Sequence, residues 1–297
     1  MVGKQERRYQ RMITVVLALI SLIMVIPLVL LVVASFTSNN EIVLHGYSFF
    51  PKELSLEAYR YIWNERAQVF HAYGITILVT AIGTTIGVMM TLLYAYVLAH
   101  EKFPGKTFLA FYLFFTMLFN GGLVPTYIMY TRYLHMKNTI PALIIPGLLM
   151  SAFNVILTRT YIQSNVPAAL SEAAKIDGAT EFQGFRKVVL PMCKPIIATV
   201  GLFAGLGYWN DWTNGLYYIT DTNKFSIQQL LNNMIKNIEF LSKNANSNIN
   251  LASVGGGIPQ ETVRMAIAIV GLLPILIVFP FVQKYFVKGI SIGAVKG

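Results

Sequence analysis

Long stretches of the chain carry no charged residue. Asp, Glu, Lys and Arg are absent from six runs, 12–40, 67–100, 107–131, 138–158, 195–210 and 265–283. A helix of about 20 mostly apolar residues crosses a bilayer. The pattern therefore predicts an all-α polytopic membrane protein with six transmembrane helices, at about 13–36, 72–99, 107–130, 140–162, 191–216 and 263–284. Asn120-Gly-Gly-Leu-Val-Pro125 is expected to break the outer part of the third.

The composition agrees with this prediction. Charged residues make up 12% of the 297 residues, whereas a soluble domain carries about 25%. A soluble enzyme and a disordered chain are therefore excluded. The single cysteine, Cys193, excludes an internal disulfide and a cysteine-rich metal site.

The net charge of +10 is explained by topology, because cytoplasmic loops of membrane proteins are enriched in Lys and Arg. Placing both termini in the cytoplasm puts nearly all of the excess basic charge on that side. The predicted organisation is a cytoplasmic tail at 1–12, a six-span domain at 13–288 with a polar external loop at 217–262, and a cytoplasmic tail at 289–297. We find no basic patch with interleaved aromatics in the sequence, which disfavours nucleic-acid binding.

The segment 166–187, between the fourth and fifth predicted spans, has the pattern of two short helices joined at a glycine. Pro167 suits a first helical position, and Gly178 suits a helix end because glycine readily adopts the left-handed conformation there. Thr180 followed by Gln183 predicts a capping box for the second helix. One face of the first helix presents Leu170, Ala173, Ala174 and Asp177. The residues alone leave two readings open: a rigid knob that docks into a cytoplasmic partner, or an amphipathic loop on the bilayer.

A resemblance favours the docking knob. The segment from Glu172 to Pro191 resembles the EAA motif of ABC importer permeases. It consists of Glu172-Ala-Ala, three residues, Gly178, nine residues and then Val188-Val-Leu-Pro191, with Val188 where the motif has Ile. Asp177-Gly-Ala179 and Pro195 resemble its carbohydrate-uptake group. The resemblance implies an ATPase-coupling role for Glu172, Ala173, Ala174, Asp177, Gly178, Ala179, Leu190 and Pro191.

Two further segments carry the resemblance over nearly the whole chain. Residues 286–297 are similar to the tail of maltose-type (MalG-like) permeases, and Asn120-Gly-Gly-Leu-Val-Pro-Thr-Tyr127 resembles the LplC-like subgroup, which takes up complex or aryl-linked oligosaccharides. In the maltose-type permeases the tail contacts the ATPase dimer. The residues in that position here are Gly293, Ala294, Val295, Lys296 and Gly297.

The resemblance implies the type I ABC importer permease fold and a pore-forming subunit with no cofactor, in a bacterial plasma membrane. The chain has no Gly-x-x-x-x-Gly-Lys-Ser/Thr phosphate loop, so ATP hydrolysis would belong to a separate ATPase dimer that receives the EAA helices in its clefts. The other implied partners are a second homologous permease forming a heterodimer, an extracytoplasmic sugar-binding protein that residues 217–262 could contact, the lipid bilayer and an oligosaccharide.

Other functions remain as alternatives. A secondary transporter predicts internal repeats and broken helices around an ion site at the middle of the membrane, and we find no clear repeat and no acidic residue at a span centre. An ABC permease for a non-sugar substrate stays open. A membrane-embedded enzyme needs clustered catalytic residues, whereas His45, His71, His100 and His135 are scattered. A purely structural scaffold would not need the docking-loop pattern.

Some residues keep two readings. Asp211 lies among aromatics at the outer end of the fifth span and is either a functional group or a helix-terminal anchor. A set of aromatics either stacks on sugar rings or packs against helices and lipid: Tyr94, Tyr96, Phe111, Tyr112, Phe114 and Phe115. Gly83/Gly87 and Gly201/Gly205/Gly207 indicate close helix packing.

Overall fold

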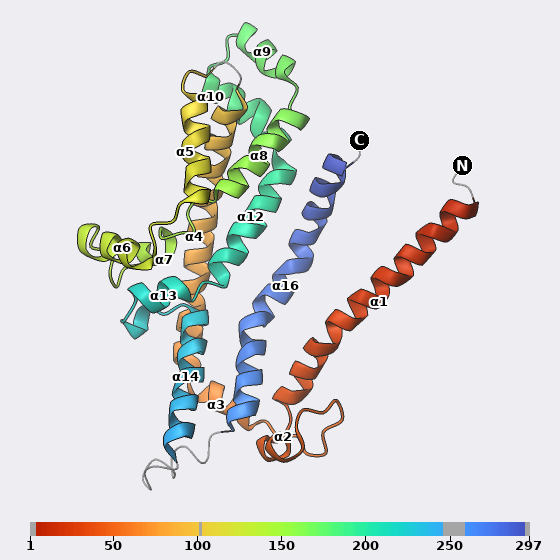
Figure 1. Ribbon diagram of the computed structural model, residues 1–297, viewed down its shortest axis with the longest axis vertical. Coiled ribbons are helices and arrows are strands. Elements are labelled where there is room, and N and C mark those ends of the chain that lie inside the picture. Colours follow the sequence, from red (N-terminus) through yellow and green to blue (C-terminus); the bar gives the residue numbers. More distant parts are fainter. Residues whose placement is uncertain (1–3, 101–102, 246–258, 295–297) are drawn as a thin grey trace. The chain divides into compact units, whose positions relative to one another are not determined.

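The computed structural model describes residues 4–100, 103–245 and 259–294. These residues form helices joined by turns (Figure 1). The extended structure within them is one isolated bridge between Thr37 and Leu54. The predicted all-α class is therefore confirmed. The chain divides into two compact units, one of residues 1–69 and 231–274 and the other of residues 70–230 and 275–297.

The first unit contains α1 (Lys4–Ser35), α2 (Asn39–His45), α3 (Glu57–Asn64) and parts of two longer helices, α14 (Ile227–Ala245) and α16 (Gln260–Ala294). Pro27 lies inside α1 without ending it, as is tolerated in lipid-embedded helices. The end of α1 is held by a 2.8 Å hydrogen bond between the Ser35 and Tyr59 hydroxyls. Glu261 at the start of α16 accepts a hydrogen bond from Tyr47 at 3.0 Å.

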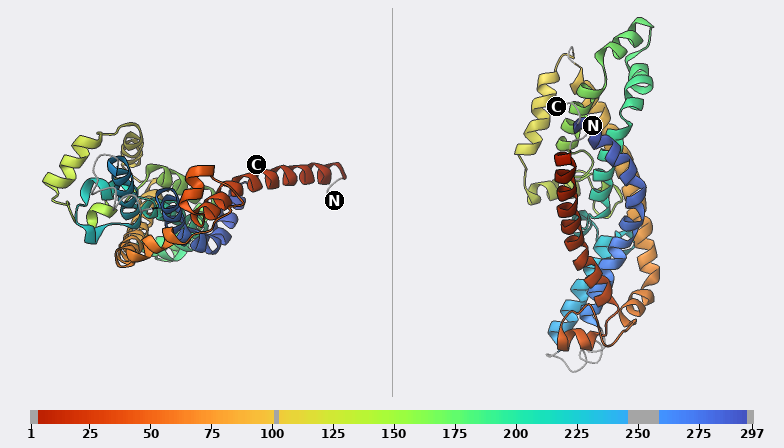
Figure 2. Two further views of the ribbon diagram at one scale, coloured as in Figure 1. Left: turned by 90° about the horizontal axis from the view of Figure 1, so that it is seen from below. Right: turned by 90° about the vertical axis from the view of Figure 1, so that its right-hand side faces the viewer.

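The second unit contains most of α4 (Arg66–Ala99), and α5 (Lys106–Leu118), α8 (Ala152–Asn165) and α12 (Lys194–Trp209) run beside it (Figure 1 and Figure 2). The shorter elements are α6 (Leu123–Ile128), η1 (Met129–Tyr133), α7 (Pro141–Ile144), α9 (Ala168–Ile176), α10 (Glu181–Gly184), η2 (Phe185–Val189), α11 (Leu190–Met192), α13 (Thr213–Tyr218) and η3 (Thr222–Lys224). Ala95, Val155 and Val189 bring α4, α8 and η2 together in a core where each is at most 1% exposed.

Small residues let these helices approach closely, as their spacing predicts. A side chain at Gly83 would collide with the ring of Tyr208 on α12, and a Cβ at Gly87 would lie 2.7 Å from the Leu149 carbonyl oxygen. The Tyr208 hydroxyl in turn donates a 2.9 Å hydrogen bond to the Ile144 carbonyl. These contacts fix α4, the segment after α7 and α12 against one another.

Three helices in the described residues are long and apolar enough to cross a membrane, in α1, α4 and α16, and two bent pairs raise this to five. The α5 and α6–η1 pair bends by 114° after Asn120-Gly121-Gly122, where the sequence predicts a break; the α10–α11 and α12 pair bends by 81°. The fourth predicted span is interrupted at 145–151, between α7 and α8. The structure therefore interrupts the predicted spans 107–130, 140–162 and 191–216, because proline removes a helical hydrogen bond and glycine permits non-helical turns, without lowering the apolarity of the segment.

The predicted external loop 217–262 contains regular structure. It contains α14, a helix of 19 residues, whose buried side chains follow helical spacing: Ile227, Leu230, Leu231, Met234 and Ile238. The many Asn, Gln and Lys residues of the segment give it a loop-like composition. The last helix, α16, continues to Ala294, so residues 289–294 of the predicted tail are helical.

Candidate functional site

The segment 166–187 forms the two short helices that its pattern predicts. Helix α9 starts at Ala168, one residue after Pro167, and Asp177 follows its last residue. Helix α10 starts at Glu181 and continues through η2 into α11. Figure 1 shows α9 and α10 together at one end of the second unit. We call residues 168–184 the coupling-helix pair, after the role that the resemblance implies.

Gly178 forms the turn between these helices and has φ of +80°. Its N–H donates to the Lys175 carbonyl at 3.0 Å, and the N–H of Ala179 donates to the Ala174 carbonyl at 2.9 Å. These two bonds are the Schellman arrangement that ends a helix at a left-handed residue. A Cβ at Gly178 would meet nothing within 4 Å, so backbone conformation rather than crowding favours glycine here.

The predicted capping box of α10 is present. The Gln183 side chain accepts from the Thr180 N–H at 2.9 Å, and the Thr180 hydroxyl accepts from the Gln183 N–H at 3.3 Å. Each bond satisfies an N–H group that has no partner within the helix. The start of α10 is therefore fixed by local sequence.

Glu181 connects the coupling-helix pair to α4. One carboxylate oxygen pairs with the Lys175 ammonium at 2.5 Å, and the other accepts from the Tyr96 hydroxyl at 3.2 Å. The His100 ring lies 3.8 Å from that second oxygen. The hydrogen bond from Lys175 lowers the pKa of Glu181. The sequence analysis missed this cluster, because no local pattern relates Glu181 to residues some 85 positions earlier.

The EAA-motif residues separate into two groups. Glu172, Ala173, Asp177 and Gly178 are exposed on or beside α9, together with Pro191, whereas Ala174, Ala179 and Leu190 are half-buried. Leu190 packs against the core that contains Val189. The structure thus presents the first part of the motif on the surface and uses Leu190 to fix the helix behind it.

Two apolar side chains add to the exposed surface of the pair. Ile176 at the end of α9 is 86% exposed and Phe182 on α10 is 62% exposed. Exposed large apolar side chains beside polar ones are typical of contact surfaces. The sequence analysis did not select them, although both flank Gly178 within the motif. Of the predicted tail residues, Gly293 and Ala294 end α16, and Val295, Lys296 and Gly297 lie outside the described residues.

Asp211 has a helix-terminal role. Its carboxylate accepts from the Thr213 and Asn214 N–H groups at 3.0 and 3.2 Å, which satisfies the first free donors of α13. Among the aromatic candidates, Tyr94 donates to the Leu109 carbonyl at 3.0 Å. In the part of the chain that the structure describes, no three His, Cys, Asp or Glu side chains group as metal ligands.

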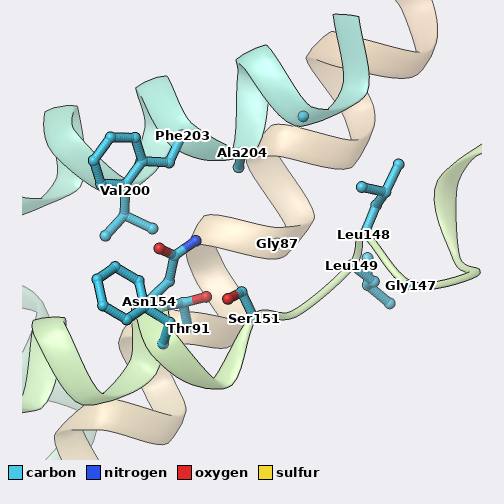
Figure 3. A pocket seen from close by; sticks show the side chains of 12 residues that line it. Gly87, Thr91, Gly147, Leu148, Leu149, Ser151, Asn154, Val200, Phe203 and Ala204 are labelled. Carbon is cyan, nitrogen blue, oxygen red and sulfur yellow. The ribbon is translucent and has the colours of Figure 1, made fainter. Parts of the chain in front are cut away.

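The second unit also contains a pocket of about 420 Å³ that the sequence did not reveal (Figure 3). Its lining comes from α4, the interrupted segment 145–151, α8 and α12: Gly87, Thr91, Gly147, Leu148, Leu149, Ser151, Phe153, Asn154, Val200, Phe203, Ala204 and Gly207. None of the aromatic residues proposed from sequence for sugar stacking lines it. Phe153 and Phe203 do.

Comparison with known proteins decides the family. The family described as "Binding-protein-dependent transport system inner membrane component" matches residues 83–292. The chain belongs to this family. The polygalacturonan/rhamnogalacturonan transport system permease protein YtcP of Bacillus subtilis (strain 168) is 35% identical over 99% of this permease and 100% of its own length. Protein LplC of the same strain is 34% identical over 93% of this permease and 90% of its own length.

A solved structure supports the same conclusion. It is described as a bacterial ABC transporter involved in the import of the acidic polysaccharide alginate. One of its chains matches this permease with a TM-score of 0.75 and 27% identity, over 96% of this permease and 99% of that chain. The family and the ABC importer permease fold that the EAA motif indicates are therefore confirmed.

Proposed function

We propose that this permease forms half of the translocation pore of an ATP-driven importer for oligosaccharides or other complex sugars. The observation that carries the proposal is the exposed helix–glycine–helix unit, with its EAA motif, in a chain that aligns end to end with a saccharide permease. The permease performs no catalysis itself. ATP hydrolysis belongs to a separate ATPase dimer.

The surface of the coupling-helix pair fits docking into a protein cleft. Exposed Ile176 and Phe182 offer apolar area, and exposed Glu172 offers a carboxylate. A buried apolar contact with a polar rim is the usual composition of a stable interface. The ATPase dimer would hold this surface, and its closure on ATP would move the pair. The connection from Glu181 to Tyr96 would pass the movement to α4.

Two further partners complete the importer. A second, homologous permease supplies the other half of the pore, and an extracytoplasmic sugar-binding protein delivers the substrate on the side of residues 217–262. Both termini lie in the cytoplasm of a bacterial cell with the spans in its plasma membrane, because that placement puts the excess of Lys and Arg inside. The proposed substrate class rests on relatives named for the transport of saccharides, among them an arabinooligosaccharide permease, AraQ of Halalkalibacterium halodurans, with 26% identity.

The test is transport by the complete complex in liposomes, with both permeases, the ATPase and the binding protein. Uptake of a radiolabelled oligosaccharide should require ATP and the binding protein, and should persist when ionophores collapse ion gradients. Uptake driven by an ion gradient without ATP would instead identify a secondary transporter. ATP-dependent uptake of peptides or ions, with no saccharide accepted, would exclude the proposed substrate class.

A further inference from the structure

The pocket of about 420 Å³ in the second unit lies where the chain leaves helical structure at 145–151. Pro146 cannot donate a backbone hydrogen bond, and Gly147 has φ of +71°. Carbonyl groups released by the interruption are satisfied by side chains: Asn214 donates to Pro146 at 2.9 Å and Tyr208 donates to Ile144 at 2.9 Å. The interruption is therefore a built feature of the fold.

The interruption at 145–151 falls within the fourth predicted membrane span, 140–162. Non-helical backbone within a membrane is tolerated where protein covers it or where it lines a water-filled cavity. Here the segment lines a pocket, and α4 approaches it closely at Gly87, where a Cβ would lie 2.7 Å from the Leu149 oxygen. Interrupted helices that line a cavity form the substrate sites of many transporters.

Three polar side chains line this pocket, from α4, the interrupted segment and the first turn of α8 (Figure 3). Asn154 is 9% exposed and Thr91 is 2% exposed. Other buried threonines, at 76, 158 and 199, donate their hydroxyls to the carbonyl four residues earlier. Among the described residues we find no hydrogen-bond partner for the Thr91 hydroxyl, the Asn154 carboxamide or the Ser151 hydroxyl.

Thr91 and Asn154 are buried residues and Ser151 is exposed, and polar side chains without a protein partner favour a ligand or water that can hydrogen-bond to them. A carboxamide and two hydroxyls can each donate and accept, which matches the hydroxyl groups of a sugar. The other lining residues are apolar, and two of them are the aromatic Phe153 and Phe203. An apolar wall with a few convergent polar groups is the usual composition of a small-molecule site.

We propose that this pocket holds one neutral sugar ring of the transported saccharide, with Asn154, Thr91 and Ser151 hydrogen-bonding to its hydroxyls. None of the lining residues is charged, so a uronate carboxylate would lose its hydration without gaining a cation. The pocket thus selects a neutral ring even if other parts of the saccharide are acidic. This inference rests on the proposed function, since it names the substrate contacts of the same importer.

The first experiment measures access to the pocket in the complete complex. The chain's own cysteine, Cys193, is 1% exposed, so a small thiol reagent would report an introduced cysteine. Ser151→Cys in the pocket should react with this reagent. A saturating concentration of the transported oligosaccharide should slow the reaction about fivefold or more, since a bound ring would cover the cysteine. Ser164→Cys, exposed near the other end of α8, is the control and should react equally with and without sugar. Equal rates for Ser151→Cys, or no reaction with or without ATP, would overturn the proposal.

The second experiment measures transport by Asn154→Leu and Thr91→Val, which keep side-chain size but remove hydrogen bonding. The KM for a neutral oligosaccharide should rise about fivefold to tenfold in each, as expected for one lost hydrogen bond. Thr85→Val is the matched control, because Thr85 is exposed on α4 and bonds its own helix at 2.7 Å. A wild-type KM in both pocket variants would overturn the proposal.

The substrate panel separates this inference from the proposed function. It contains short neutral arabino-, malto- and galacto-oligosaccharides and, as the acidic series, oligogalacturonides. If the wild-type complex transports no saccharide, the proposed function fails. If it transports only the oligogalacturonides, the importer stands and the neutral-ring pocket is wrong.

Discussion

Tyr96, near the C-terminal end of α4, donates a 3.2 Å hydrogen bond to Glu181, the first residue of α10. The same carboxylate pairs with Lys175 on α9, so one side chain joins both coupling helices to α4. The Tyr96 ring also packs at 5.0 Å from the ring of Phe185, next to α10. Thr91 in the pocket lies on α4 roughly one and a half helical turns before Tyr96. A displacement of the coupling-helix pair therefore has a direct route to the pocket wall.

We expect Glu181→Gln and Tyr96→Phe each to lower the amount of sugar transported per ATP hydrolysed. Because Glu181 is largely exposed, the free energy of unfolding should change by less than about 1 kcal/mol. The double variant should be no worse than the more impaired single variant, because both act through one contact. Uptake and ATP hydrolysis are measured together in liposomes.

Tyr94→Phe is the control for this contact. Tyr94 lies two positions from Tyr96 and donates to the Leu109 carbonyl at 3.0 Å, so its hydroxyl does not touch the coupling helices. It should leave the transport-to-hydrolysis ratio near wild type. A ratio that falls equally in Tyr94→Phe and Tyr96→Phe would mean that the loss reflects general packing of α4.

The features that the sequence predicted are those that local patterns determine. The helix end at Gly178 and the capping box of Thr180 and Gln183 depend on residues within one or two turns, and both are present. The Glu181–Tyr96 contact joins positions 85 residues apart, and no local pattern contains it. The pocket arises from four separate segments and was invisible for the same reason.

Hydrophobicity predicted where the apolar segments lie but not their course. A window of apolar residues has the same hydropathy whether the chain continues straight or bends by 114° after Asn120-Gly121-Gly122. Pro146 and Gly147 likewise interrupt a run that is apolar throughout. Helix α14 was missed for the converse reason: the segment is rich in Asn and Lys, although its buried face follows helical spacing from Ile227 to Ile238.

The proposed orientation predicts opposite labelling of two introduced cysteines in intact cells. Thr222→Cys, exposed in η3, should react with a membrane-impermeant thiol reagent. Ala169→Cys, exposed on α9, should react only after the membrane is permeabilised. The unmodified chain is the background control, since Cys193 is 1% exposed. Labelling of Ala169→Cys in intact cells would reverse the orientation and remove the docking role of the coupling helices.

The C-terminal residues give a second coupling prediction. Helix α16 extends to Ala294, and the family resemblance suggests that the end beyond it contacts the ATPase dimer. Deleting 289–297 should lower ATPase stimulation and uptake while membrane insertion stays normal. Deleting 2–7, at the other predicted cytoplasmic end, is the control and should have little effect. Unchanged stimulation and uptake in the C-terminal truncation would contradict a coupling role.

Glu172 tests the polar part of the docking surface. Its side chain is exposed on α9, so Glu172→Ala should not alter the stability of the permease appreciably. If Glu172 becomes a buried charge pair in the ATPase cleft, its loss should weaken binding by about 2–5 kcal/mol, and by much less at a rim. Co-purification of the ATPase measures the effect. Glu57→Ala, exposed on α3, is the control, and equal retention of the ATPase by both variants would exclude Glu172 from the interface.

Gly178 provides the sharpest test, because conformation and contact can be separated there. Its φ of +80° disfavours any side chain, although nothing lies within 4 Å of its Cβ position. Gly178→Ala should therefore cost about 1–2 kcal/mol in the turn through backbone strain. Aspartate adopts a positive φ more readily than alanine does, so Gly178→Asp should strain the backbone less. It adds a charged side chain at the proposed ATPase cleft.

If the coupling-helix pair docks at Gly178, Gly178→Asp should release the ATPase or abolish binding-protein-stimulated ATP hydrolysis more completely than Gly178→Ala. If only the shape of the turn matters, alanine should be the more harmful change. Gly184→Ala is the matched control: Gly184 has an ordinary helical φ of −59° and equally open surroundings, so alanine should be neutral or slightly stabilising there. Co-purification and ATP hydrolysis of Gly178→Asp at the level of Gly184→Ala would show that this turn does not couple the permease to ATP.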